Sequence, residues 1–349
     1  MFLAWKEIVR NKLKFSLVVM VLVMISYLVF LLSGLAGGLM NMNRESIDLW
    51  ESDAIVLNDD ANNTIAQSFI SEDELPDIDE NNTSIIQTSL IVSNEDNEES
   101  AFLFGVEDDT SFIIPSLESG DMFENTGEVI ADASLKEEGF EIGDELSLAS
   151  SDETLEITGF TESAKYNAAP TMYSSMDTVR EINPMYGDDT VSAMVIQGDT
   201  GDVELDDSLV MMPTEDFINE LPGYQAQNLT LNFMIIFLFV ISALVIGIFL
   251  YVITLQKRQL FGVLKAQGFT NGMLAASVFA QTLILSIIGT TIGLGLTLVT
   301  GLFLPDVVPV TFDYVTLSLY AVVLILVALL GGLLSVSSIR KVDPLEAIG

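Results

Sequence analysis

The chain has 349 residues, of which 50% are hydrophobic, and its formal net charge is −37, with 13 Lys and Arg against 50 Asp and Glu. So few basic residues argue against nucleic acid as a partner, because phosphate binding requires Lys and Arg. The absence of Cys and His excludes disulfides, thiolate or imidazole metal sites and Ser-His-Asp triads. We therefore predict no catalytic residues, no resident cofactor and no metal site, and we expect the chain not to be an enzyme.

The first apolar run follows a short basic segment. Residues 1–14 contain four Lys and Arg, and residues 15–40 contain no charged side chain. A run of this length exceeds the ~20 residues that cross a bilayer. A cleaved signal peptide is the competing interpretation, but the run is too long and no clean cleavage site ends it. We expect a cytoplasmic N-terminal segment and a retained transmembrane helix.

Residues 41–228 have the opposite composition. All but five of the Asp and Glu residues of the chain lie here, with apolar residues in short groups. This pattern predicts a folded, acidic domain of the α+β type. Among its runs of Asp and Glu, none has the spacing of an EF-hand, so a solvated surface is favoured over a calcium site.

Local patterns predict some elements of this domain. Thr154–Phe160 and Val191–Gln197 indicate strands, and the segment after Glu128 indicates a strand, a short helix, a turn and another strand. Two polar segments, Asn81–Ser84 and Ser93–Ser100, are typical of exposed loops.

Three further apolar runs complete the membrane part, at residues 229–255, 273–303 and 315–337. They are separated by a basic loop at 256–272 and a short turn at 304–314, and a tail follows at 338–349. Nine of the 13 Lys and Arg lie in the N-terminal segment, the basic loop and the tail, which places these three in the cytoplasm. We predict a multi-pass protein of the cell membrane: four transmembrane α-helices, with a large α+β extracytoplasmic domain inserted between helices 1 and 2.

The membrane part gives two negative indications about function. None of the four spans contains an ionisable residue, which argues against a proton-coupled carrier. The sequence also lacks a P-loop, so any ATP must be bound by another polypeptide.

Small residues recur within the first span (Gly34, Gly38) and the third (Gly289, Gly293, Gly295), a spacing typical of close helix packing or dimerisation.

Two cytoplasmic segments have structure-forming patterns. In the 256–272 loop, apolar residues alternate with polar ones in a pattern that predicts a short amphipathic helix ending at Gly268. Such a helix either lies in the lipid interface or transmits force from a cytoplasmic motor, and periodicity leaves both open. In the tail, Asp343, Pro344 and Glu346 are typical of a helix start, with a frayed end as the alternative.

Two motifs carry a resemblance to a known family. The topology, with Phe261-Gly-Val-Leu-Lys-Ala-Gln-Gly-Phe-Thr after the second span and Lys341-Val-Asp-Pro-Leu-Glu-Ala-Ile at the end, resembles the FtsX/MacB-type ABC transporter permeases. Three further segments, Ser26–Ala36, Ser208–Asn228 and Tyr251–Lys257, are similar to the haem-efflux members of that family in Gram-positive bacteria.

The resemblance implies partners and a substrate. It implies a homodimer in the lipid bilayer with two copies of a cytoplasmic ABC ATPase, which would hold the ATP and Mg. It further implies that the complex expels haem, or a similar amphipathic compound, from the membrane. The ATPase would dock on the loop and the tail, through Lys257, Arg258, Phe261, Gly262, Leu264, Lys265, Gly268, Asp343, Pro344 and Glu346.

A haem substrate would need an iron ligand, and without His the remaining choices are Met, Tyr or a carboxylate. Five residues of the first span or its outer end are candidates: Met24, Tyr27, Met40, Met42 and Glu45. The alternative is that these side chains only pack or anchor the helix.

A different class of function stays open. The assembly could be a mechanotransmitter whose outer domain activates an extracellular cell-wall hydrolase or a signalling partner. A stand-alone receptor or adhesin explains the acidic domain but not the three further spans.

Overall fold

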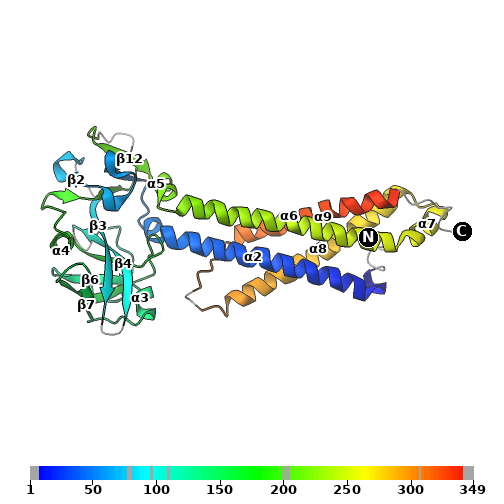
Figure 1. Ribbon diagram of the computed structural model, residues 1–349, viewed down its shortest axis with the longest axis horizontal. Coiled ribbons are helices and arrows are strands. Elements are labelled where there is room, and N and C mark those ends of the chain that lie inside the picture. Colours follow the sequence, from blue (N-terminus) through cyan, green and yellow to red (C-terminus); the bar gives the residue numbers. More distant parts are fainter. Residues whose placement is uncertain are drawn as a thin grey trace. The chain divides into compact units, whose positions relative to one another are not determined.

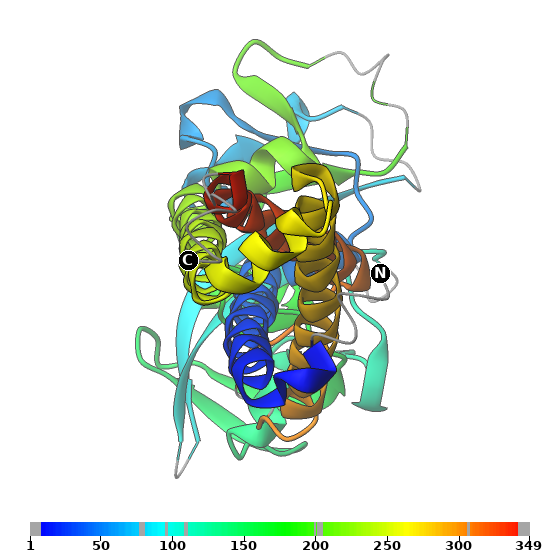
Figure 2. The ribbon, with the colours of Figure 1, turned by 90° about the vertical axis from the view of Figure 1, so that its right-hand side faces the viewer.

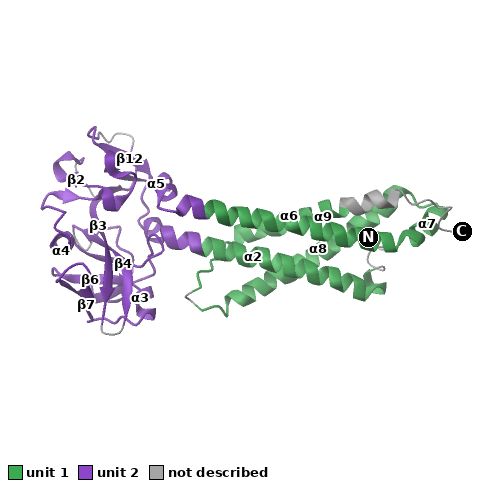
Figure 3. Ribbon diagram, viewed as in Figure 1, with its two compact units in different colours: residues 1–38, 228–349 green, residues 39–227 purple. Residues whose placement is uncertain are grey.

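The computed structural model describes residues 8–76, 81–94, 97–107, 111–198, 200, 205–305 and 308–340. The chain divides into two compact units (Figure 3): residues 1–38 with 228–349, and residues 39–227. We call the first the membrane unit and the second the sheet unit, and describe each by itself.

Long apolar helices form the membrane unit, and four of those described are long and apolar enough to cross a membrane. They run alongside one another in Figures 1 and 2. The sheet unit is inserted between the first and second of them, so the predicted fold class is confirmed: four helices that can span a membrane, with a large sheet-rich domain between helices 1 and 2. The helices are α2 (Lys12–Leu49), α6 (Tyr224–Gln256), α7 (Arg258–Ala266), α8 (Asn271–Gly301) and α9 (Tyr314–Arg340).

Glycine and hydroxyl side chains bring α2 and α8 into close contact. A Cβ atom built on Gly293 would lie 2.0 Å from Ser26 Oγ, and one on Gly289 would lie 2.5 Å from Leu22 Cβ. Ser26 Oγ lies within hydrogen-bond distance of two carbonyl oxygens, that of Leu22 on its own helix at 2.8 Å and that of Gly289 on α8 at 3.2 Å. Gly289 and Gly293 therefore pack helices, as their spacing predicts. Gly295 differs, since a Cβ built there has nothing within 4 Å.

Gly34 and Gly38 of α2 pack against the connection between α8 and α9. A Cβ on Gly34 would lie 2.6 Å from a ring carbon of Phe312, and one on Gly38 would lie 2.2 Å from the Pro309 carbonyl oxygen. The Thr311 N–H donates to the Gly34 carbonyl at 3.0 Å. The prediction of helix packing or dimerisation is therefore wrong for this pair, because an extended segment of the same chain fills the space beside both glycines.

The sheet unit is built on one large, mostly antiparallel sheet. Its strand order is β12-β1-β11-β3-β4-β9-β6-β8-β5, with β7 paired to β3 and β8, and β4/β9 and β6/β8 are parallel pairs. A separate pair joins β2 and β10. The strands are β1 (Ala54–Asn58), β2 (Ile70–Ser71), β3 (Asn82–Ser93), β4 (Glu98–Val106), β5 (Leu117–Gly120), β6 (Glu128–Asp132), β7 (Glu145–Leu148), β8 (Thr154–Thr161), β9 (Thr171–Ser175), β10 (Thr190–Val191), β11 (Ala193–Ile196) and β12 (Leu209–Pro213).

Side chains of the central strands alternate between two hydrophobic cores. In β4, Leu103 belongs to one core and Phe104 to the other, and in β9 Met172 and Tyr173 divide in the same way. Successive side chains of a strand point to opposite faces, so the sheet is buried on both sides. The first core also contains residues of α3 (Ser134–Glu137) and α4 (Met176–Ile182).

The second core receives the elements that lead to the first two spans. Ile47, at the end of α2, and Trp50, which directly follows it, are fully buried in this core. Phe217 and Ile218 of α5 (Thr214–Glu220) join the same core, as does Tyr224, the first residue of α6. One face of the sheet therefore packs against both the end of α2 and the start of α6.

Most local predictions for this unit are confirmed, one is wrong and one is wrong in part. Strands occur at Thr154–Thr161 and Ala193–Ile196, and β6, α3 and β7 follow one another after Glu128. Asn81–Ser84, however, is not an exposed loop: residues 82–84 begin β3, and Ser84 is fully buried. The Ser93–Ser100 prediction is wrong at both ends, because Ser93 is the last residue of β3 and β4 starts at Glu98.

Candidate functional site

The short helix α7 ends where the sequence predicts. Gly268 has a φ of +94°, a left-handed conformation that glycine adopts without strain. Its N–H donates to the Lys265 carbonyl at 2.9 Å, and the next N–H, of Phe269, donates to Leu264 at 3.1 Å. These paired bonds satisfy carbonyls at the helix end, so Gly268 fixes the end of α7.

The predicted coupling residues of α7 differ in their burial. Phe261 is 3% exposed and packs with Leu274 and Val278 of α8, and Gly262 is also buried. Arg258 is exposed. Phe261 therefore attaches α7 to α8, and neither Phe261 nor Gly262 presents an exposed surface.

Sequence reasoning did not include two exposed residues of α7 in the coupling set. Leu260 is 49% exposed and Val263 is 41% exposed, and their separation of three residues places them on one side of the helix. An apolar residue on a short amphipathic helix is easily assigned to the buried face, and only the contacts of Phe261 show which face is which.

Lys257 lies between α6 and α7 and contacts the helix bundle. Its Nζ is 4.7 Å from the centroid of the Phe15 ring and donates a 3.5 Å hydrogen bond to Gln281 Oε1. The neighbouring Gln256 accepts a 2.7 Å hydrogen bond from Lys14 Nζ. Lys257 thus connects the loop to α2 and α8. Asp343, Pro344 and Glu346 lie outside the described residues, and their role stays a prediction.

Met24 and Tyr27, two of the candidate haem ligands, belong to the membrane unit. Met24 is 56% exposed, whereas Tyr27 is half-buried and its hydroxyl lies 3.2 Å from Thr300 Oγ1 of α8. Residues three apart on a helix lie on neighbouring parts of its surface. Met24 presents an open thioether, and Tyr27 is engaged with α8.

The other three candidates belong to the sheet unit, where the side chains of Met40 and Glu45 are engaged in packing or hydrogen bonds and Met42 is half-buried. Met40 packs against the second core. The Met42 carbonyl accepts the N–H of Ala168 at 3.0 Å. Glu45 Oε2 accepts from Ser163 Oγ at 3.1 Å and from the Lys165 N–H at 3.2 Å. Across the described residues, no group of three or more Asp and Glu side chains is arranged to hold a metal ion.

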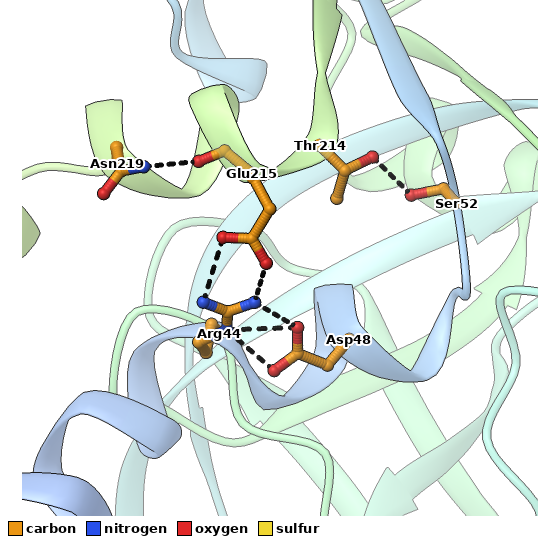
Figure 4. Close-up of polar contacts among 6 residues, drawn as sticks. All are labelled: Arg44, Asp48, Ser52, Thr214, Glu215 and Asn219. Carbon is orange, nitrogen blue, oxygen red and sulfur yellow. Dashed lines mark hydrogen bonds and ion pairs between the residues drawn. The ribbon is translucent and has the colours of Figure 1, made fainter.

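A charged cluster that sequence reasoning missed lies at the end of α2 (Figure 4). The Arg44 guanidinium donates to Asp48, one turn further along α2, with Nε–Oδ2 and Nη2–Oδ1 distances of 2.8 Å. It also donates to Glu215 of α5, at 2.5 Å and 3.3 Å. The spacing of Arg44 and Asp48 is a readable signal for the first pair. Nothing in the sequence indicates Glu215.

Near this cluster, Ser46 of α2 and Trp50, directly after the helix, present a hydroxyl and an aromatic group to the sheet. Ser46 Oγ lies 3.2 Å from the hydroxyl of Tyr173, and Trp50 meets Phe104 edge to face at a centroid distance of 5.5 Å. Burial raises the pKa of Tyr173, and the hydrogen bond with Ser46 lowers it in part. The fully buried Tyr173 is therefore a neutral phenol at neutral pH.

Comparisons with known proteins now connect these features. Residues 232–344 match the family model described as FtsX-like permease C-terminal. The matched segment contains most of α6, from residue 232, together with α7, α8 and α9, so the exposed face of α7 lies within it.

Full-length relatives extend the likeness to the rest of the chain. A protein of Staphylococcus haemolyticus (strain JCSC1435), assigned as the hemin transport system permease protein HrtB, is 24% identical over 353 residues, covering 100% of this chain and 99% of its own. A protein assigned the same way in Staphylococcus epidermidis (strain ATCC 12228 / FDA PCI 1200) is 26% identical over 356 residues with the same coverage. The resemblance to permeases of this type is therefore confirmed.

Among solved structures, the extracellular domain of the noncanonic ABC-type transporter YknZ from Gram-positive bacteria aligns with 45% of this chain and 89% of its own. Its identity is 10% and the TM-score is 0.30, too low to support an inference. The FtsX-like permease domain and the full-length relatives together support a permease subunit of an ABC transporter.

Proposed function

We propose that this chain is the permease subunit of an ATP-driven efflux complex, in which two copies of the chain pair with two copies of a separate cytoplasmic ATPase. Its substrate is haem or a similar amphipathic compound taken from the membrane. The observation that carries the proposal is the full-length likeness to proteins assigned as hemin transport permeases. The absence of a P-loop from the sequence supports a separate ATPase with its own ATP and Mg.

In this proposal both termini and the 256–272 loop lie in the cytoplasm. Basic residues support this orientation, since Arg10, Lys12 and Lys14 flank the first span, and Lys257 and Arg258 follow the second. The sheet unit, which contains nearly all of the carboxylates, then lies outside the cell.

The ATPase docks on the exposed face of α7, which contains Leu260 and Val263. A helix of nine residues is too short to be stable alone in water, so its packing on α8 through Phe261 keeps it folded. Force applied to the exposed face therefore passes to α8 through the same contact. Lys257, held against Phe15 and Gln281, offers a second path to α2 and α8.

Met24 is the first ligand to test for a haem that arrives from the lipid. Its thioether is exposed, and Met is one of the side chains that can ligate haem iron. Tyr27 would first have to release Thr300, and Glu45 would have to release Ser163 and the Lys165 N–H. We therefore place Tyr27, Met40, Met42 and Glu45 behind Met24 as ligands.

The test is the ATPase activity of the complex in lipid nanodiscs, with and without haem. We expect haem to raise the rate of ATP hydrolysis, and Met24→Leu to lower this stimulation about tenfold, the factor that corresponds to ~1.4 kcal/mol of lost ligand binding. Met20→Leu is the matched control, because Met20 is 63% exposed on the same helix and one turn away.

Three results would contradict parts of the proposal. Equal loss in Met20→Leu and Met24→Leu would remove Met24 as a ligand. ATP hydrolysis that ignores haem would favour another amphipathic substrate, or the mechanotransmitter that activates a wall hydrolase or a signalling partner. A chain that co-purifies with no ATPase would overturn the central statement.

A further inference from the structure

The end of α2 and the short helix α5 are joined by one guanidinium group (Figure 4). Arg44 donates to Asp48 on its own helix and to both carboxylate oxygens of Glu215 on α5. Its side chain is 23% exposed, whereas Asp48 is 41% exposed and Glu215 is 70% exposed. The cation is thus the shielded member, and it lies between two carboxylates of different elements.

Two further contacts join α5 to the segment just beyond the end of α2, without Arg44. Ser52 Oγ lies 3.0 Å from Thr214 Oγ1, at the first residue of α5. The Thr214 N–H donates to the Asp53 carbonyl at 3.0 Å. The chain therefore meets α5 both at Arg44 and just beyond the end of α2.

The charge of the sheet unit makes Arg44 hard to replace. The sequence of residues 39–227 contains only four Lys and Arg: Arg44, Lys136, Lys165 and Arg180. Without the guanidinium, the carboxylates of Asp48 and Glu215 would face each other and repel. Arg44 converts this repulsion into attraction between α2 and α5, and its planar, multi-donor group can hold both carboxylates at once.

The contact between Arg44 and Glu215 matters because α5 directly precedes the second span in the chain. α5 ends at Glu220, and α6, the second span, begins at Tyr224. α2 is itself one continuous helix from Lys12 to Leu49. The tie between Arg44 and Glu215 therefore joins the outer end of the first span to the helix that directly precedes the second.

We infer that Arg44 is a positioning residue that couples the two spans: it holds α5 to the end of α2, so that displacement of α2 is passed to α5 and on to α6. The inference rests on the proposed function, because the ATPase is the source of the displacement. The contact between Arg44 and Glu215 does not itself depend on the proposed function. Asp48 only supports the guanidinium, whereas Glu215 carries the coupling.

The two carboxylates provide a matched pair of variants. Glu215→Gln removes the ionic contact to α5, and Asp48→Asn removes one of similar geometry within α2. In the full chain in nanodiscs, without ATPase, we expect hydrogen exchange of the α5 amides to rise about fivefold in Glu215→Gln, the factor that corresponds to ~1 kcal/mol for a partly exposed ion pair. Asp48→Asn should leave this exchange unchanged. An equal effect of both variants, or no effect of Glu215→Gln, would contradict the statement that the Arg44–Glu215 ion pair holds α5 to the end of α2.

A disulfide tests whether the connection, rather than the charge, matters. The chain has no Cys, and the side-chain oxygens of Ser52 and Thr214 lie 3.0 Å apart, so sulfur atoms placed there come within bonding reach. We expect Ser52→Cys with Thr214→Cys, added to Glu215→Gln, to restore slow exchange in α5 when oxidised and to lose it when reduced. Failure of the oxidised protein to restore it would overturn the inference.

The complete complex then tests the coupling. With the ATPase trapped by ATP and vanadate, we expect exchange to change at both the end of α2 and α5 in the wild type, but only at the end of α2 in Glu215→Gln. The same change at α5 in both proteins would overturn the inference. A wild-type complex in which neither segment responds, although the tie is present in the chain alone, would count against the proposed function instead.

Discussion

The sheet unit and the membrane unit obtain close packing in opposite ways. In the sheet unit, large side chains fill two cores, and aromatic rings such as Trp50, Phe104 and Tyr173 are fully buried. In the membrane unit, the closest contacts occur where side chains are missing, as at Gly289 and Gly293 against α2. Water drives apolar side chains together in the sheet unit, but lipid does not, so helices in a bilayer depend on close backbone approach and interhelical hydrogen bonds.

The comparison predicts opposite sensitivities. Removing atoms should damage the sheet unit most, because a cavity remains in a dense core. Adding atoms should damage the membrane unit most, because the backbones have no room to move apart without losing their contacts.

The largest effect is expected for Phe104→Ala. Phe104 is fully buried and contacts Trp50, Tyr166 and Tyr173 at centroid distances of 5.5, 5.6 and 5.7 Å. Loss of the ring leaves a cavity among these three side chains, and we expect the free energy of unfolding to fall by about 4 kcal/mol. Urea unfolding in nanodiscs, followed by Trp50 fluorescence in a Trp5→Phe background, measures it.

Met185→Ala is the control for this prediction, since Met185 is 70% exposed. Its substitution should change the unfolding free energy by less than about 0.5 kcal/mol. Similar losses in the two variants would mean that the second core is not packed around Phe104.

A smaller effect, of the opposite kind, is expected for Gly293→Ala. The added Cβ would lie 2.0 Å from Ser26 Oγ and 3.0 Å from the Tyr27 nitrogen, so α2 and α8 must separate or Ser26 must turn away. We expect a loss of about 2 kcal/mol, measured as a lower unfolding temperature of the chain in nanodiscs. Gly295→Ala adds the same atom two residues away in open space, and it should be neutral or slightly stabilising. Equal behaviour of the two glycines would break the comparison.

The sequence predicted the spans and several strands because their signals are local. An uninterrupted apolar run identifies a membrane helix whatever it packs against, and Gly268 ends α7 through its own backbone conformation. The start of β3 was missed for the converse reason. Thr83 and Ser84 are polar and buried, because β3 is covered on both faces, and this depends on strands far along the chain.

The same distinction applies to the candidate site. Arg44 and Glu215 are 171 residues apart, and no local pattern joins them. The coupling residues of α7 were predicted as a set, but only the packing of Phe261 on α8 separates the inward residues from the outward ones. The sequence also could not indicate that residues 309–312 fill the space beside Gly34 and Gly38, because small residues are compatible with any close neighbour.

The smallest predicted effect concerns a single carboxylate among the many of the sheet unit. Glu128 accepts hydrogen bonds from Asn125 Nδ2 at 2.7 Å, from the Glu124 N–H at 2.7 Å and from the Asn125 N–H at 3.0 Å. These bonds, that of the Asn125 side chain first, lower the pKa of Glu128. A lowered pKa in the folded state means that the stabilisation is present above the ordinary carboxylate pKa and is lost as the pH falls through the lowered one.

Glu128→Gln should therefore cost about 1 kcal/mol or less at neutral pH, since the group is largely exposed, and the difference from the wild type should vanish in acid. The other carboxylates act in the opposite direction, because their protonation relieves mutual repulsion as the pH falls. Unfolding temperatures of the wild type, Glu128→Gln and the exposed control Glu137→Gln, measured between neutral and acid pH, separate the two effects. A deficit in Glu128→Gln that persists in acid would mean that shape, rather than charge, makes Glu128 stabilising.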